Sequence, residues 1–358
     1  MNSFVISAAR CLAFFAFLAP AAKASSVGQY LPAVDDYIVP AYRALTNATV
    51  ALDTRAVSFC RAPTQAGLDA LRESFHESMD AWQWIQMVRF GPVVYLTRSN
   101  RYQMWPDKRG TVAKHLRLLL TSKDPEALEP ERFATESVAV QGLSALEILL
   151  FDSHASPEDF SGDNGAYACK VLLAITANLA RMSNRVTANW IDGDDAYRQY
   201  IANAPEGNAV FEDERSVGAQ LLNDLRTTLE FVNQHKLSRP LGENIERARP
   251  KRSESWRSRR STKNIRVNLE GARRLYQSAF APRLAGTALD AEIEAGFDGA
   301  LAAADGIPMP LSEAVTDPSS RARVEALRDR VSALEKLLAS PVAEALDLPM
   351  GFNSLDGD

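Results

Sequence analysis

The chain has 358 residues, of which 46% are hydrophobic and 24% charged, the composition of a soluble globular protein long enough for two domains or one large one. Its 45 acidic residues outnumber its 40 basic ones, which gives a formal net charge of -5. A surplus of negative charge argues against nucleic acid or an anionic membrane as a general partner.

The N-terminus has the form of a signal peptide. Arg10 precedes the apolar run CLAFFAFLAP, which is too short for a good membrane span, and Ala22-Lys23-Ala24 has the small-x-small pattern of a signal-peptidase site. We expect cleavage after Ala24 and a periplasmic or secreted protein. Loss of Arg10 and Lys23 leaves 38 basic against 45 acidic residues, a net charge of -7. Cys11 lies before the apolar run, so a lipid anchor is not expected.

Two cysteines remain in the expected mature chain, Cys60 and Cys169. In an oxidising compartment an even pair favours a disulfide, which would close a long loop and contribute up to ~4 kcal/mol on the chain-entropy model. Two buried free thiols are the alternative. No C-x-x-C spacing occurs, so the sequence does not indicate a metal-binding or catalytic cysteine.

Apolar residues recur at three- and four-residue spacing along most of the chain. This period predicts helices, and no segment has the alternation of a convincing strand. We therefore expect an all-α fold of antiparallel helical bundles. The predicted helices cover residues 33–60, 66–90, 111–120, 138–152, 167–192, 217–235, 265–280, 287–304 and 311–338.

The segment VAVQGLSALEILLFD, residues 138–152, has the pattern of a helix buried on most sides. Two of its residues do not suit that position. A glycine inside a helix costs roughly 1 kcal/mol against alanine, and a carboxylate in apolar surroundings needs a partner, a proton or a metal ion. Gly142, Ser144 and Glu147 form the pattern G-x-S-x-x-E, in which Ser144 and Glu147 share one helix face.

This pattern resembles the G-x-H-x-x-E signature of the imelysin family, with serine in place of histidine. The segment AWQWIQMVRFGP is similar to the family's W-x-x-x-Q-x-x-R-F-G-P, MWPDKRG to F-W-P-D-x-R-G, and the ending MGFNSLDGD to G-F-N-x-x-D-G-D. A fourth segment is similar to E-x-x-x-S-x-x-S, and its matching residues are Glu254, Ser258 and Ser261, with Asn264 and Asn268 beyond them. The resemblance extends from about Leu31 to Asp358.

The resemblance implies a fold of two related helical bundles, with the motif near the groove that they share. We accordingly expect residues 1–24 to be the signal peptide, residues 25–160 an N-terminal bundle with the motif helix, and residues 161–358 a second bundle. It also implies a periplasmic protein of an iron-associated family that is assigned to the metallopeptidases.

Gly142, Ser144, Glu147 and Arg89 are expected to line a ligand groove. In one interpretation Glu147 binds a divalent iron or zinc ion, although the hydroxyl of Ser144 is a weaker ligand than the family's histidine. In the other, Gly142 and Ser144 are small residues that allow close packing, and Glu147 binds a basic group. Arg89 is the first candidate for that group because it ends the polar part of the stripe on the helix 66–90; a solvated surface position for Arg89 is the alternative.

No catalytic residue is assigned. A metallopeptidase would need to recruit a histidine such as His76 or His115, because no H-E-x-x-H pattern is present. A serine mechanism lacks a nucleophile elbow and identifiable partners. Glu73, His76, Glu77 and Asp80 lie within two turns of one predicted helix and could hold a second metal ion, but such a cluster is usually the solvent face of an amphipathic helix.

The segment 247–260 is basic, with Lys251, Arg252, Arg257 and Arg259. It could bind an anionic ligand such as a polysaccharide or a carboxylate through arginine forks. The alternative is a solvated linker whose charge offsets an acidic protein.

These observations favour a periplasmic, imelysin-like protein that binds a metal ion or a small ligand and is linked to iron uptake, with no catalytic activity assigned. An active metallopeptidase is one alternative. An interaction scaffold with a closed, dry groove around Ser144 is another. Peripheral association with envelope proteins is left open, and no transmembrane helix is expected.

Overall fold

The computed structural model describes residues 28–349, and every regular element in this range is helical, which confirms the all-α fold. The predicted signal peptide and the C-terminal GFNSLDGD segment lie outside the described residues. The α-helices are α1 (Leu31–Ala33), α2 (Val39–Arg61), α3 (Gln65–Ile85), α4 (Arg98–Tyr102), α5 (Thr111–Ser122), α6 (Pro130–Phe133), α7 (Leu143–Phe151), α8 (Gly162–Ile191), α9 (Tyr197–Ala202), α10 (Glu214–Phe231), α11 (Arg239–Leu241), α12 (Ser261–Ala279), α13 (Ala281–Leu284), α14 (Ala288–Asp305), α15 (Leu311–Ala314), α16 (Pro318–Leu338) and α17 (Ser340–Ala345).

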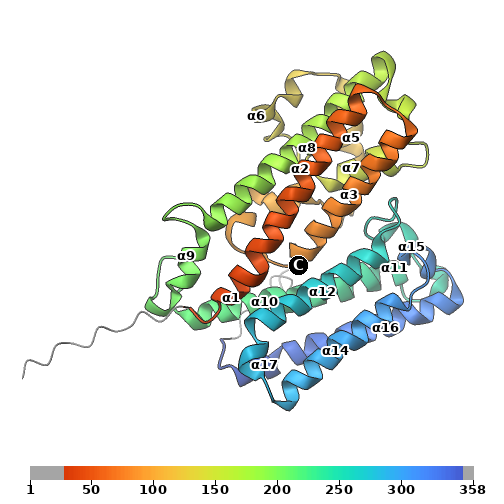
Figure 1. Ribbon diagram of the computed structural model, residues 1–358. Helices are drawn as coiled ribbons and strands as arrows, with labels where there is room; N and C mark the ends of the chain where they lie inside the picture. Colours follow the sequence, from red (N-terminus) through yellow and green to blue (C-terminus); the bar gives the residue numbers. More distant parts are fainter. Residues whose placement is uncertain (1–27, 350–358) are drawn as a thin grey trace, which may run out of the picture.

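The long helices form two groups (Figure 1). In the first group α2 packs against α3 and α8, and the shorter α7 packs against α3 and α5. In the second group α12 lies between α10 and α14, and α16 packs against α10 and α14. The groups meet where α12 packs against α3. A β-carbon at Gly271 of α12 would lie 2.5 Å from the carbonyl oxygen of Trp84, so glycine permits this close approach.

Helix α3 shows how the sequence determines these elements. Thr64 caps its N-terminus, because the hydroxyl accepts a hydrogen bond from the backbone N–H of Gly67 at 3.1 Å. Its buried face carries Leu68, Leu71, Phe75, Met79 and Trp82 at helical spacing. This face packs into the core that is shared by both groups of helices.

The division between the two bundles at residue 160 stays a prediction. Helix α8, which this division assigns to the second bundle, packs along α2 in the first group. The packing therefore favours a boundary beyond Ile191, the last residue of α8. No described helix is long and apolar enough to cross a membrane.

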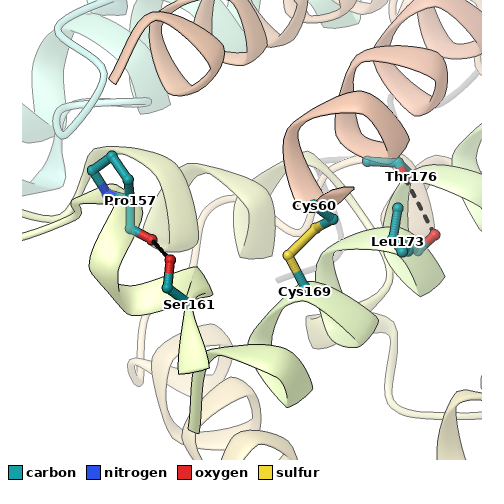
Figure 2. Close-up of a disulfide and its surroundings, with 6 residues drawn as sticks. All are labelled: Cys60, Pro157, Ser161, Cys169, Leu173 and Thr176. Carbon is teal, nitrogen blue, oxygen red and sulfur yellow. Dashed lines mark hydrogen bonds between the residues drawn. A yellow bond between two sulfur atoms is a disulfide. The ribbon is translucent and has the colours of Figure 1, made fainter. Parts of the chain in front are cut away.

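A disulfide joins Cys60, near the end of α2, to Cys169 on α8 (Figure 2). The S–S distance is 2.07 Å and the two Cα atoms are 5.7 Å apart. This confirms the bond that the sequence favours over two free thiols. The disulfide fixes α8 to α2 and encloses the helices that lie between them in the chain.

The segment 138–152 is not one continuous helix, contrary to the prediction. A 3-10 turn, Val138–Val140, is followed by a break, and α7 begins only at Leu143. Gly142 is the N-cap of α7 and has an extended backbone conformation. A β-carbon there would lie closer than 3.0 Å to the carbonyl oxygens of Arg101 and Tyr102. Gly142 is therefore explained by the close approach of α4 and not by a position inside a helix.

Candidate functional site

Helix α7 forms one wall of a cavity of about 330 Å³. Ser144 and Glu147 both line it, and the loop around Trp105 and the segment from Lys251 to Arg257 supply the other walls. The cavity therefore lies between the motif helix of the first group and the basic segment that leads into α12 of the second.

The two motif side chains differ in how they are held. The Ser144 hydroxyl donates a hydrogen bond to the carbonyl oxygen of Met104 at 3.1 Å. Glu147 is 8% exposed, and its Oε1 accepts hydrogen bonds from the backbone N–H and the hydroxyl of Ser258, at 2.9 and 2.8 Å. Its Oε2 receives no hydrogen bond from the described residues. Burial raises the pKa of Glu147, and the bonds from Ser258 and the charge of Arg257 oppose this rise.

The structure does not bring Arg89 to Glu147. Helix α3 ends at Ile85, so the helical periodicity that led to this prediction does not extend to Arg89. The backbone N–H of Arg89 donates to Oδ2 of Asp224 at 2.7 Å, and its guanidinium lies 5.1 Å from the centre of the Phe231 ring. The partner of Glu147 is Ser258 instead, a residue that the E-x-x-x-S-x-x-S resemblance singles out.

Asp224, the neighbour of Arg89, is buried on α10, and this burial raises its pKa to about 7. Hydrogen bonds from the backbone of Arg89 and the amide of Gln220 oppose the rise. In the variant Asp224→Asn the amide oxygen can still accept the N–H of Arg89, and a flipped Gln220 can accept from the new amide nitrogen. The variant is therefore expected to fold.

Asp224→Asn is expected to change how stability depends on pH. Between the ordinary aspartate pKa of 3.8 and about 7, the folded chain keeps a proton that the unfolded chain releases. The free energy of unfolding then falls by about 1.4 kcal/mol per pH unit, or about 2 kcal/mol from pH 5 to pH 6.5. Burial lowers the pKa of His76 and His235 to about 4, which works in the opposite direction.

The free energy of unfolding of the variant and of the parent is measured in urea at each pH, and the two are compared. Asp195→Asn, at an exposed position, is the control. The stability of the Asp224 variant relative to the parent should rise steadily with pH. Parallel profiles for the two proteins would show that Asp224 does not hold this proton.

A buried ion pair lies behind the cavity wall. Lys236 and Glu254 are each 2% exposed, and their Nζ and Oε2 atoms are 2.8 Å apart. Lys236 also donates to Oε1 of Gln83 at 2.8 Å and to Oδ1 of Asn268 at 2.6 Å, which uses all three of its protons. Burial lowers the pKa of Lys236, and the charge of Glu254 opposes this effect.

The carboxylate of Glu254 is equally well partnered. Oε1 accepts from the amides of Gln83 at 3.2 Å and Gln103 at 3.0 Å, and Oε2 accepts from Asn264 at 3.0 Å in addition to Lys236. We call Gln83, Gln103, Lys236, Glu254, Asn264 and Asn268 the buried network. Because its charges are fully paired, the network holds α3, α12 and the basic segment together and leaves no free group for chemistry.

No motif in the sequence singles out Lys236, Gln83 and Gln103 as members of this network. A lone lysine at the end of a predicted helix is usually solvated. Lys236 does, however, continue the buried stripe of Leu229 and Val232 at three- and four-residue spacing, and this signal could have identified it. The matching residues Glu254, Asn264 and Asn268 all take part in the network.

The histidines do not gather at the cavity. None of the described residues that line it is a histidine, and residues 28–349 contain no group of three His, Cys, Asp or Glu side chains that could hold a metal ion. His76 packs against the rings of Phe75 and Phe151. Asp80 forms ion pairs with Arg260 and with Lys263, the latter at 2.7 Å. Of the four residues in the charged cluster on α3, Asp80 thus pairs with α12 and with the residue before it.

The basic segment is not a solvated linker. Ser253, Glu254 and Ser258 are buried within it. Nε of Arg257 lies 3.6 Å from Oδ1 of Asp152, the residue after α7, and Arg259 forms an ion pair with Glu313. The segment is a packed wall of the cavity that leads directly into α12.

The fold and site define an all-α protein of two helix groups, with a buried glutamate at a cavity between them. A sequence model of the imelysin family matches residues 38–338, and the chain belongs to this family. Iron-regulated protein A of Synechococcus elongatus is 24% identical over 324 residues, which cover 86% of this chain and 83% of that protein.

Two solved structures have the same fold. The crystal structure of an imelysin-like protein from Psychrobacter arcticum 273-4 has a TM-score of 0.76 at 22% identity, over 91% of this chain and 96% of that one. A candidate iron-regulated protein A precursor from Parabacteroides distasonis has a TM-score of 0.70 at 13% identity, over 87% and 92% of the two chains. At such identities the likeness establishes the fold alone.

Proposed function

We propose that this protein is an exported binding protein of the imelysin family, linked to iron uptake, which holds a small ligand in the cavity at Ser144 and Glu147. One observation carries the proposal: Glu147, 8% exposed, presents an Oε2 atom without a hydrogen bond from the described residues at a cavity of about 330 Å³. This volume is at the lower end of the range for small-molecule sites. The name of the relative in Synechococcus elongatus supports the link to iron.

A bare metal ion fits the cavity poorly. Glu147 offers one free carboxylate oxygen, and the hydroxyl of Ser144 already donates to a carbonyl. Ferrous iron and zinc prefer several nitrogen, sulfur or carboxylate ligands, and histidine is absent from the described lining. We therefore assign no reaction step to a metal and propose that any metal enters with ligands of its own.

The test is a thermal-shift and calorimetric screen of the chain from residue 25 onward, against small metabolites and against ferrous iron and zinc. A ligand present at 100 times its dissociation constant should stabilise the fold by about 2.7 kcal/mol. Ser144→Phe, which places a ring in the cavity, should abolish this effect while circular dichroism reports a folded chain. A second variant, Glu147→Gln, tests the carboxylate itself. Its matched control is Glu73→Gln, on the exposed face of α3.

Ferrous iron or zinc alone should bind no better to the parent than to Glu147→Gln. Stoichiometric binding of either ion that is lost in Glu147→Gln would instead make Glu147 a metal ligand. If neither a metabolite nor a metal binds, the proposed function is wrong.

A further inference from the structure

The cavity is strongly basic. Five cationic side chains line it, against two carboxylates, Asp107 and Glu147. Three of the five, Lys108, Arg239 and Arg252, form no hydrogen bond or ion pair through their side chains with the described residues. In an acidic protein such a concentration of positive charge around one hollow favours an anionic occupant.

The two carboxylates offset only part of this charge. Both oxygens of Asp107 accept backbone N–H groups at the start of α5, from Thr111 at 2.8 Å and Val112 at 2.9 Å. Burial raises the pKa of Glu147, so its protonated form is more accessible than that of an exposed glutamate. In that form Oε2 can donate a hydrogen bond to an anion in the cavity and does not repel it.

Two buried polar atoms on the cavity wall lack a hydrogen bond. The hydroxyl of Ser253, a residue that is 1% exposed, has no partner, and Nε of Arg257 has only the ion pair with Oδ1 of Asp152, which at 3.6 Å is too long for a hydrogen bond. A polar group left buried without a partner costs about 1–3 kcal/mol, and Nε of an arginine can only donate. An occupant with acceptor oxygens would satisfy both atoms.

Trp256 also lines the cavity, and its indole ring contacts two of the cations. The guanidinium of Arg257 lies 4.4 Å and Nζ of Lys251 lies 5.3 Å from the centre of its ring. The ring therefore holds both cations at the cavity while their charged groups stay available to a ligand.

We infer that the cavity binds a small organic polyanion with two or more carboxylate or phosphate groups. Lys251, Arg252, Arg257 and Ser253 hold one anionic group. Arg239, on the helix α11 that packs against the turn at Pro250–Arg252, and Lys108, on the loop after Trp105, hold another. This assignment rests on the proposed function and names its class of ligand. A polyanion can bring a metal ion on its own oxygens, which would connect the site to iron without metal ligands from the protein.

The experiment is isothermal titration calorimetry of the chain from residue 25 onward with citrate and with pyrophosphate. One molecule should bind per chain, and the affinity should fall as salt is raised. Acetate, with a single anionic group, and triethyl citrate, which is neutral, should bind at least 100-fold more weakly. Whichever of the two polyanions binds with the higher affinity shows whether the site prefers carboxylates or phosphates.

Arg252→Gln and Lys251→Gln change exposed side chains and should each weaken polyanion binding about tenfold, as should Lys108→Gln on the other wall. Arg259→Gln is the matched control: it removes the same charge from the same segment, but Arg259 pairs with Glu313 and does not line the cavity.

Equal binding of citrate to the parent, Arg252→Gln and Lys251→Gln would overturn the inference. So would binding of triethyl citrate as strong as that of citrate. A neutral ligand whose binding is lost in Ser144→Phe would overturn the inference and leave the proposed function standing. Failure of every ligand class would overturn both.

Discussion

Replacing Lys236 with methionine is expected to lower the free energy of unfolding by about 3–5 kcal/mol, the cost of leaving one member of a buried ion pair without its partner. Glu254, 2% exposed, would lose its cationic partner and have only the amides of Gln83, Gln103 and Asn264 around its carboxyl group. Methionine has a similar length and fills most of the volume, so the charge is the main change. Urea unfolding followed by circular dichroism measures the loss.

The double variant Lys236→Met with Glu254→Gln isolates this effect. Because no buried charge is left, it should recover more than half of the loss, as the replacement of buried ion pairs in other proteins suggests. Lys263→Met is the matched control. Lys263 is 57% exposed and pairs with Asp80, so its removal should cost less than about 1 kcal/mol. Equal losses for the two lysine variants would mean that the buried pair does not stabilise the fold as we describe.

Removal of the disulfide is the second large effect. Cys60 and Cys169 are separated by 109 residues, and a loop of this length corresponds to about 4–5 kcal/mol on the chain-entropy model. The variant with both cysteines changed to alanine should lose about that amount in urea unfolding. Its tertiary contacts should persist, because α8 packs along α2 over most of its length (Figure 1).

Reduction provides the control for this prediction. The parent protein in reducing agent should unfold at the same urea concentration as the double alanine variant, and the variant should be unaffected by the reductant. If the reduced parent is as stable as the oxidised one, the disulfide contributes nothing to stability and the entropy argument does not apply to this chain.

The all-α fold could be predicted from the sequence because the signals that mark helices are local. Helical periodicity and helix-stopping residues predicted the long helices to within a few residues in most cases. The errors arose where a helix changes geometry: α10 continues into a π-helical turn, Val232–Ser238, and the helix predicted over 311–338 breaks before Pro318. Apolar spacing does not detect such breaks, since both sides of each one are buried in the same core.

The site was predictable only in part. Ser144, Glu147 and the residues that resemble the family pattern do come together, and Glu147 reaches Ser258 across 111 residues of chain. No sequence pattern could say that Ser258 rather than Arg89 would face Glu147, because this depends on how α7 and the basic segment pack. Tertiary structure determines the partners of a buried charge, and the spacing of residues within one helix does not predict them.

The hydrogen bonds between Glu147 and Ser258 have a further consequence. They join the motif helix of one helix group to the segment that leads into the other, and the cavity opens beside this joint. A ligand that touches both walls acts as a reversible crosslink between segments that are far apart in the chain. The two helix groups should therefore separate less readily in molecules with a bound ligand than in empty ones. Where proteases are abundant, the empty protein should be degraded faster, so the lifetime of the protein would report whether its ligand is present.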